Sequence, residues 1–339
     1  MGKPPIAAGI DRPALEAFLH ENFGPGDLHL TKIAGGQSNP TFFVDHGDRR
    51  MVLRKQPPVV LARGAHAIDR EFRILKALRH TPVPVPDPIL FHAEPDILDT
   101  PFYLMERIDG RVFQDCTLPG VPTSERTEMY MSVARTLASL HALRPEAVGL
   151  ADYGPRGNYF ERQLTRWTEA YRRSSGPPIP ALDTLTVWLR DNLPRDDGQV
   201  TIVHGDFRIG NLMFHPTKPE VVGVLDWELS TLGHPLADLG YCCMPWWTSS
   251  DEFGGIRDAD HAALGLPAQA EFVETYYRHA VPTGQLLPFH VAFALFRFAV
   301  IFVGISDRSR EGTATSADAA EIGVLAERFA ARALEDIKG

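Results

Sequence analysis

The sequence of 339 residues predicts an α+β protein of two lobes, a small strand-rich lobe over residues 1–108 and a larger helical lobe over residues 109–339. Three observations lead to this prediction. Segments with strand-like alternation dominate before residue 108, and amphipathic helical segments dominate after Gly110. Two short strand-like segments in the second half flank a polar loop. The length also suits about two domains of roughly 150 residues each.

The first lobe begins with a helix predicted over residues 11–23, where Asp11 is a candidate N-cap. A glycine-bearing loop then joins two strands, the second of them at residues 51–55. Apolar side chains recurring on one face predict a helix over residues 65–80. Four prolines in the following ten residues favour extended backbone, and residues 102–108 form the last predicted strand of this lobe.

The second lobe is predicted to be mainly helical. Its strand candidates are short and lie at residues 199–204 and 221–226. Ser124 is a candidate cap for the first helix of the lobe. Before the strands, helical spacing predicts three helices, over residues 124–143, 158–173 and 181–193.

One apolar stretch, residues 289–305, could be mistaken for a membrane span. It falls short of the about 20 apolar residues that a bilayer needs, and Arg297 lies at its centre. A charge at the middle of a bilayer is costly. We therefore predict a buried helix of a soluble domain and no membrane partner.

Composition excludes several classes of protein. The formal net charge is −9, from 43 acidic and 34 basic residues, which argues against a general nucleic-acid-binding protein. Three cysteines without a Cys-x-x-Cys spacing argue against a disulfide framework or a zinc ribbon. The chain does not begin with a basic segment followed by an apolar core, so we expect a cytoplasmic protein. The sequence indicates no oligomeric state.

The polar loop between the two late strands contains the informative motif. One strand leads into His204-Gly205-Asp206, Asn211 follows five residues after Asp206, and Asp226 ends the second strand. Strand ends project side chains into loops, so these groups can converge. Carboxylate and amide oxygens are the ligands that magnesium prefers beside phosphate oxygens. A carboxylate that does not bind the metal could accept a proton from an attacking hydroxyl.

This arrangement resembles the aminoglycoside phosphotransferase and choline kinase-like family, a branch of the protein-kinase-like fold. The family signature of His-Gly-Asp, then Asn, then a distal Asp is present in order. The resemblance implies a two-lobed kinase-like fold with a nucleotide-binding N-lobe and a C-lobe for catalysis and substrate binding. It also implies ATP and Mg²⁺ as cofactors and a small hydroxylated molecule as acceptor.

The resemblance assigns roles to the residues of the loop. Asp206 would be the catalytic base, and Asn211 and Asp226 would hold magnesium. His204 and Asp238 would support the loop structurally. The alternative for Asp206 is a loop carboxylate that caps backbone amides, and for Asp226 a turn residue at the end of a strand.

The same family needs a cation on a strand of the N-lobe to grip phosphates. The resemblance places Arg54 in that role, although protein kinases use Lys there, and strand alternation directs Lys55 to the other face. Glu71 resembles the helix carboxylate that pairs with this cation. The alternative for Glu71 is a solvated helix carboxylate.

The resemblance also implies nucleotide contacts in two other segments. Gly36 and Ser38 belong to the loop GGQSNPTFFV, whose small residues would let backbone amides approach phosphates, and an ordinary hairpin turn is the alternative. Met105, Glu106 and Ile108 lie on the connector that meets adenine in this fold, or serve as hinge packing. The sequence has no Gly-x-x-x-x-Gly-Lys-Ser/Thr, so it is not a P-loop NTPase.

Closer similarity points to the phosphotransferase branch that occurs fused to acyl-CoA dehydrogenases in animals and stands alone in many bacteria. The segments that carry it are VLRKQPP, AHAIDREFRILKAL, VPVPDPI, TPFYLMERIDGRVF, VHGDFRIGNLMFHP and VLDWELSTLGHPLADL. This branch implies a hydroxyacyl-CoA or a related hydroxy acid as acceptor. Arg297, Arg308 and Arg310 are candidate contacts for an anionic CoA ester, with solvated arginines or local ion pairs as the alternative.

Three other functions remain open from the sequence. The acceptor could be an aminoglycoside antibiotic, a polycation whose binding would require an acidic pocket. The chain could be a non-catalytic nucleotide-binding pseudokinase, which the retention of Asp206, Asn211 and Asp226 argues against. A metallophosphoesterase would show further blocks of His and Asp ligands, which the sequence lacks.

Overall fold

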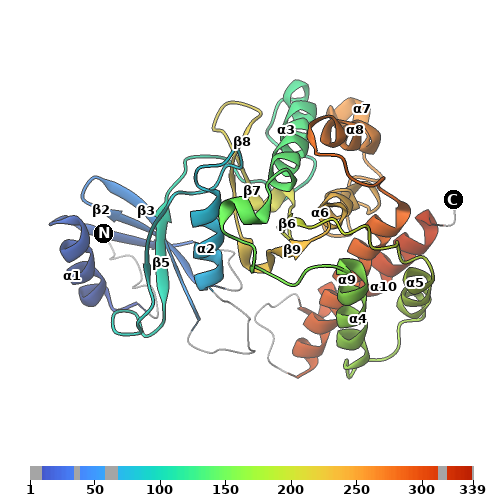
Figure 1. Cartoon of the computed structure of the whole chain (residues 1–339), viewed down its shortest axis with the longest axis horizontal. Helices are drawn as coiled ribbons and strands as arrows, with labels where there is room; N and C mark the ends of the chain where they lie inside the picture. The colour runs from blue at the N-terminus through green and yellow to red at the C-terminus, as the bar shows by residue number, and fades with distance from the viewer. Residues whose placement is uncertain (1–9, 34–38, 58–67, 312–318, 338–339) are drawn as a thin grey trace. The chain divides into compact units, whose positions relative to one another are not determined.

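A computed structural model of the protein describes residues 10–33, 39–57, 68–311 and 319–337 (Figure 1). The chain divides into two compact units. The first unit contains the residues up to Asp109 together with Gly223–Glu228. The second unit contains Gly110–Val222 and the residues from Leu229 onward. Each unit is described by itself below.

The first unit is built on a five-stranded antiparallel sheet in the order β1-β2-β3-β5-β4. Asp11 caps the first helix by accepting from the amide of Ala14, as the sequence predicted. The second helix lies within its predicted range. The elements are α1 (Arg12–Phe23), β1 (Leu28–Lys32), β2 (Thr41–His46), β3 (Arg49–Lys55), α2 (Ile68–Leu78), β4 (Pro88–His92) and β5 (Phe102–Glu106).

Alternation along β3 and β5 separates the two faces of this sheet. Leu53, Phe102 and Leu104 join the side chains of α1 in one apolar core. Arg54 and Tyr103 lie opposite each other in the strand register, and both side chains bond to α2. The period of two residues therefore decides which side chains of β3 face α2.

The proline-rich segment ends in β4, which pairs with β5 at the edge of the sheet. The register shifts between Pro88 and Leu90. Proline has no amide hydrogen to donate to a ladder, so an edge strand is where a sheet tolerates it. The predicted extended backbone is confirmed, and the structure adds its place in the sheet.

The second unit is mainly helical, as predicted. β6 pairs with β9 and β7 pairs with β8 in two small sheets. The elements are α3 (Thr123–His141), α4 (Tyr159–Arg172), α5 (Pro180–Asp191), β6 (Thr201–Val203), β7 (Leu212–Phe214), β8 (Val221–Val224), β9 (Thr231–Gly233), α6 (Pro235–Cys242), α7 (His261–Leu264), α8 (Gln269–His279), α9 (Pro288–Arg310) and α10 (Ala319–Asp336). Gly223 and Val224, the last two residues of β8, belong to the first unit.

The start of α3 differs from the prediction. Ser124 is the second residue of the helix rather than its cap, and Pro122 occupies the N-cap position without a side-chain capping bond. Proline fixes φ near −65° and has no amide hydrogen, so it suits the boundary of a helix. Here the fixed backbone of proline begins the helix in place of a capping hydroxyl.

The helix α9 corresponds to the apolar stretch of the sequence. Among the described residues it alone is long and apolar enough to cross a membrane, and 78% of its most apolar window is buried inside the fold. Its neighbours in the second unit are α4, α5, α6 and α10. This burial is what the sequence predicted for a core helix.

Candidate active site

Arg54 is the centre of a charged cluster in the first unit. Its Nη2 donates to Oδ1 of Asp226 at 2.8 Å and to Oε1 of Glu71 at 3.3 Å. Its Nε lies 2.9 Å from Oε2 of Glu71 as an ion pair. Burial acts to lower the pKa of Arg54, but the charges of Glu71 and Asp226 outweigh burial and raise the pKa.

Lys55 points to the other face of the sheet, as alternation predicted. Its Nζ donates to the carbonyl of Leu98 at 2.9 Å, and the residue is buried. Burial lowers the pKa of Lys55. Of the two adjacent cations, Arg54 is the one that faces the carboxylates.

Glu71 is almost completely buried on α2, so it is not a solvated helix carboxylate. Besides Arg54, its partners are Asn39, which donates through Nδ2 at 3.0 Å, and Tyr103, whose hydroxyl donates at 2.9 Å. Burial raises the pKa of Glu71, and the charge of Arg54 opposes that shift. The carboxylate is thus held in one orientation by three side chains.

Asp226 follows β8 in a backbone conformation that non-glycine residues rarely adopt, with φ = 65°. Aspartate tolerates this left-handed conformation better than most residues because its short polar side chain can bond locally. The conformation turns the side chain toward Arg54. A strained aspartate at such a position is typical of a functional site.

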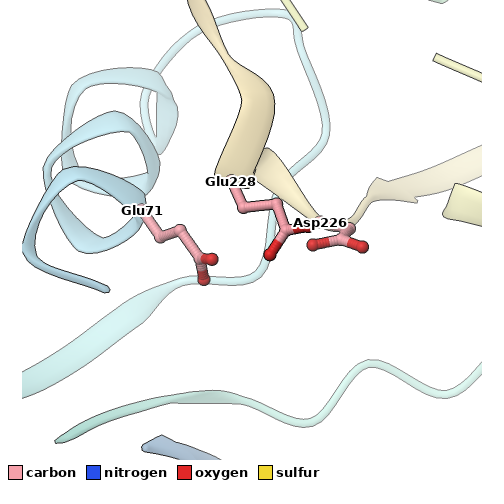
Figure 2. A group of neighbouring side chains, drawn as sticks. All are labelled: Glu71, Asp226 and Glu228. Atoms are coloured by element: carbon pink, nitrogen blue, oxygen red, sulfur yellow. The ribbon is translucent and has the colours of Figure 1, made fainter. Parts of the chain in front are cut away.

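Glu228 completes the cluster and was not predicted from the sequence. Its Oε2 lies 3.9 Å from Nη2 of Arg54. One carboxylate oxygen from each of Glu71, Asp226 and Glu228 lies within 4.8 Å of the others, and Figure 2 shows the three side chains pointing toward one another. The signal in the sequence was the spacing Asp-Trp-Glu, but only the short helical turn at residues 227–229 brings the second carboxylate around.

The charges of this cluster suit a divalent cation. Three carboxylates face one guanidinium, which leaves excess negative charge. Carboxylate oxygens are the ligands that magnesium and calcium take from proteins. The donor set therefore fits the Mg²⁺ expected from the sequence.

The second cluster lies in the second unit, in the loop after β6. Asp238, near the start of α6, accepts from the amide of His204 at 2.7 Å and from the amide of Gly205 at 2.9 Å. Gly205 has φ = 83°, and a Cβ at this position would lie 2.7 Å from the carbonyl oxygen of Leu229. The glycine of the motif is therefore required by both its conformation and its surroundings.

Asp238 is fully buried, which alone would raise its pKa. Hydrogen bonds from His141 and the Gly205 amide stabilise the carboxylate instead, so its pKa lies below the usual value. His141 Nε2 lies 3.5 Å from Oδ2 of Asp238, and its Nδ1 lies 2.8 Å from the hydroxyl of Tyr276. His141 therefore connects the carboxylate of Asp238 to Tyr276.

Asp206 is bonded at both carboxylate oxygens. Asn211 Nδ2 donates to Oδ2 at 2.6 Å and to the backbone carbonyl of Asp206 at 2.9 Å. The hydroxyl of Tyr241 donates to Oδ1, and Arg208 Nε lies 3.4 Å from the same oxygen. His204 Nδ1 accepts from the amide of Asp206 at 3.1 Å. The partners of this carboxylate are side chains rather than the backbone amides of a loop cap.

A cavity of ≈ 290 Å³ lies within the second unit, and its lining includes Phe207, the residue after Asp206. Phe207, Arg208 and Tyr241 line it on the side of the loop. Among the described residues that line it, Arg208 is the one charged side chain and none is an aspartate or glutamate. The apolar part of the wall includes Tyr130, Met244, Phe253, Phe272, Phe298 and Phe329.

The structure does not test the other predicted nucleotide contacts. Gly36 and Ser38 lie outside the described residues. Met105 and Glu106 end β5, where the Glu106 amide donates to the carbonyl of Asp87 at 2.8 Å, and Ile108 follows, half-buried. The roles of these residues stay predictions.

Arg297 and Arg310, both candidate contacts for a CoA ester, have partners within their own unit. Arg297 is buried and donates to the carbonyl of Gly205 at 3.2 Å, so it supports the loop that carries Asp206. Arg310 pairs with Asp307. Arg310 therefore fits the alternative of a local ion pair, whereas Arg297, buried and bonded to a backbone carbonyl, is not a solvated arginine.

Comparison with known proteins places the chain in a family. The model of the phosphotransferase enzyme family matches residues 29–277. Acyl-CoA dehydrogenase family member 10 of Mus musculus is 42% identical over 327 residues, which is 95% of this chain and 30% of that protein. The chain spans between 30% and 42% of the length of the curated relatives that it matches.

Solved structures of phosphotransferases are also similar to this chain. A protein from Ralstonia eutropha, named as an aminoglycoside phosphotransferase, is 42% identical with a TM-score of 0.87, over 97% of this chain and 98% of that one. The aminoglycoside phosphotransferase APH(4)-Ia, in a ternary complex with AMP-PNP and hygromycin B, is 15% identical with a TM-score of 0.61, over 94% of this chain and 98% of that one. The predicted fold class, an α+β kinase-like fold, is confirmed.

Proposed function

The chain belongs to the phosphotransferase enzyme family, and on that premise we propose that it transfers the γ-phosphate of ATP to a hydroxyl of a hydroxyacyl-CoA or a related hydroxy acid. The family supports a small-molecule kinase. The acceptor is our proposal. The similarity to proteins named as acyl-CoA dehydrogenases, of which this chain spans the smaller part, agrees with an acyl acceptor.

The observation that supports this acceptor is the apolar cavity beside Asp206. A hydrocarbon chain gains about 0.8 kcal/mol for each CH₂ group that it buries. A polycationic aminoglycoside would instead need carboxylates in the wall, and the described lining residues include none. The cavity therefore favours an acceptor with an apolar body over an antibiotic with several ammonium groups.

Asp206 is our proposed catalytic base. Its carboxylate would orient the acceptor hydroxyl and take its proton as the oxygen attacks the γ-phosphorus and the bond to the β-phosphate oxygen breaks, so that ADP leaves. Asn211 and Tyr241 hold this carboxylate at its two oxygens. His204, Asp238 and Arg297 would keep the loop in place through the bonds described above.

Asn211 and Asp226 remain our proposed magnesium ligands, and Glu228 joins them as a further candidate. When bound, Mg²⁺ would neutralise charge on the phosphates of ATP. Arg54, aligned by Glu71, would bind phosphate oxygens through its planar fork of donors. The AMP-PNP complex of a protein with the same fold supports ATP as the donor.

The test of the acceptor is mass spectrometry of products after incubation with ATP and Mg²⁺. The panel contains hydroxyacyl-CoAs of increasing chain length, the matching free hydroxy acids, and aminoglycosides including hygromycin B. We expect a phosphorylated product from the hydroxyacyl compounds. The comparison of CoA esters with free acids shows whether the CoA part contributes to binding.

Other results of this panel would contradict the proposal. A phosphorylated aminoglycoside as the sole product would keep the kinase and overturn the acceptor. Tight ATP binding without any product would favour the pseudokinase. Absence of ATP binding would overturn the roles proposed for Arg54 and Glu71.

Replacement of Asp226 tests the magnesium site. In Asp226→Ala, one anionic ligand of the cation is lost, and we expect the Mg²⁺ concentration for half-maximal ATP binding to rise by at least about 10-fold. Calorimetric titration of ATP at a series of Mg²⁺ concentrations measures this shift. Asp48→Ala, which removes an exposed carboxylate of the same unit, is the matched control. An identical magnesium dependence in Asp226→Ala and the parent would remove Asp226 from the site.

A further inference from the structure

One face of α6 holds three consecutive residues of the loop. Asp238 accepts from the amides of His204 and Gly205, and Tyr241, three residues later on the same helix, donates to Asp206. Side chains three residues apart lie on the same face of a helix. The helix therefore fixes the backbone before Asp206 with one side chain and the carboxylate of Asp206 with the next.

The hydroxyl of Tyr241 is suited to this contact. The residue is buried, and burial together with the neighbouring charge of Asp206 raises the pKa of Tyr241 well above its usual value. The phenol therefore stays protonated and can only donate to the carboxylate. Asn211 donates to the other oxygen, so rotation of the carboxylate would break two hydrogen bonds.

The ring of Tyr241 has a second contact surface. It lines the apolar cavity beside Asp206. The ring is packed against Phe298 at a centroid distance of 5.4 Å, and the guanidinium of Arg297 lies 5.9 Å from its centroid. One rigid side chain thus touches both the catalytic carboxylate and the space for the acceptor.

We propose that Tyr241 is the positioning residue of the reaction: its hydroxyl orients Asp206, and its ring forms the wall against which the apolar part of the acceptor rests. This inference rests on the proposed function, because it assigns the acceptor to the cavity. One side chain would then both contact the bound acceptor and set the orientation of the Asp206 carboxylate.

Two substitutions separate the two parts of Tyr241. Tyr241→Phe removes the hydroxyl and keeps the ring, so kcat should fall by about 10- to 100-fold, the range for a lost hydrogen bond to a charged group, while the KM values for ATP and acceptor stay unchanged. Tyr241→Leu also removes the ring, so the KM for the acceptor should rise in addition. A drop in kcat common to both variants with no difference in acceptor KM would overturn the role of the ring.

A double-mutant cycle distinguishes positioning from a structural effect. If Tyr241 acts through Asp206, then Tyr241→Phe should have no further effect on kcat in the Asp206→Ala background. Additive losses would overturn the positioning role. The control is Tyr153→Phe, which removes another buried hydroxyl of the same unit. This hydroxyl is bonded to Oγ of Ser230 at 2.7 Å, and Tyr153 does not line the cavity. The control should leave kcat at the parental value.

The same cycle measured on the free energy of unfolding needs no substrate. A nonzero coupling between positions 241 and 206 is expected there as well, and zero coupling would overturn the contact itself. If the parent phosphorylates no hydroxyacyl compound, the proposed function is wrong. If the parent phosphorylates these compounds and Tyr241→Phe is fully active, only the inference about Tyr241 is wrong. If the parent phosphorylates only aminoglycosides, the kcat cycle is run with that acceptor, and it then tests the orientation of Asp206 without the acyl acceptor.

Discussion

Replacement of Asp206 by Ala is expected to lower the turnover number by about 10²- to 10⁴-fold, the range for loss of a general base, while ATP binding persists. The carboxylate is held by Asn211 and Tyr241 in the second unit. The phosphate-binding cation that we propose, Arg54, belongs to the first unit with its own partners. Loss of Asp206 should therefore affect the proton transfer and the orientation of the acceptor more than the nucleotide.

Steady-state kinetics with the preferred acceptor and calorimetry with ATP measure the two effects separately. Asp183→Ala is the control, because it removes an exposed carboxylate from α5 in the same unit. We expect it to behave as the parent in both assays. If ATP affinity collapses together with turnover in Asp206→Ala, the assignment of Asp206 as the base is wrong.

Arg54→Met is expected to lower the free energy of unfolding by about 3–5 kcal/mol, the cost of leaving a buried charge without its partner. Glu71 is 2% exposed and Arg54 is its cationic partner. Asp226 and Glu228 would lose the same neighbour. Four charged groups would become three carboxylates without a compensating cation.

Denaturant unfolding of the parent and the variants measures this loss. Arg54→Lys keeps the charge but not the fork of donors, so we expect a smaller destabilisation. The double variant Arg54→Met with Glu71→Gln removes the buried charge as well, and it should be more stable than Arg54→Met alone. A double variant as unstable as the sum of its single variants would show that the pair is not coupled.

Much of the fold follows from periodicity, which is a local property of the chain. The helices at residues 12–23 and 68–78 and the strands at 49–55 and 102–106 lie where period-3.6 and period-2 patterns predict them. The same period of two decides that Arg54 faces the carboxylates and Lys55 the opposite side. The cap of α3 was predicted wrongly because Ser124 and Pro122 are both suited to the start of a helix, and the backbone geometry favoured proline.

The sequence by itself determined the family and the order of the motif, because His204, Asp206, Asn211 and Asp226 lie on one continuous stretch of chain. Only the tertiary structure decided what surrounds them. Arg54 is 172 residues from Asp226, and Tyr241 is 35 residues from Asp206, so no local pattern records either contact. Three other features likewise depend on which faces pack together: the burial of Glu71, the bond from Arg297 to the carbonyl of Gly205, and the apolar cavity. The physical reason is that a periodic pattern shows which face of a helix or strand is buried. It does not show which other element packs against that face, because that depends on the packing of all the elements of the fold.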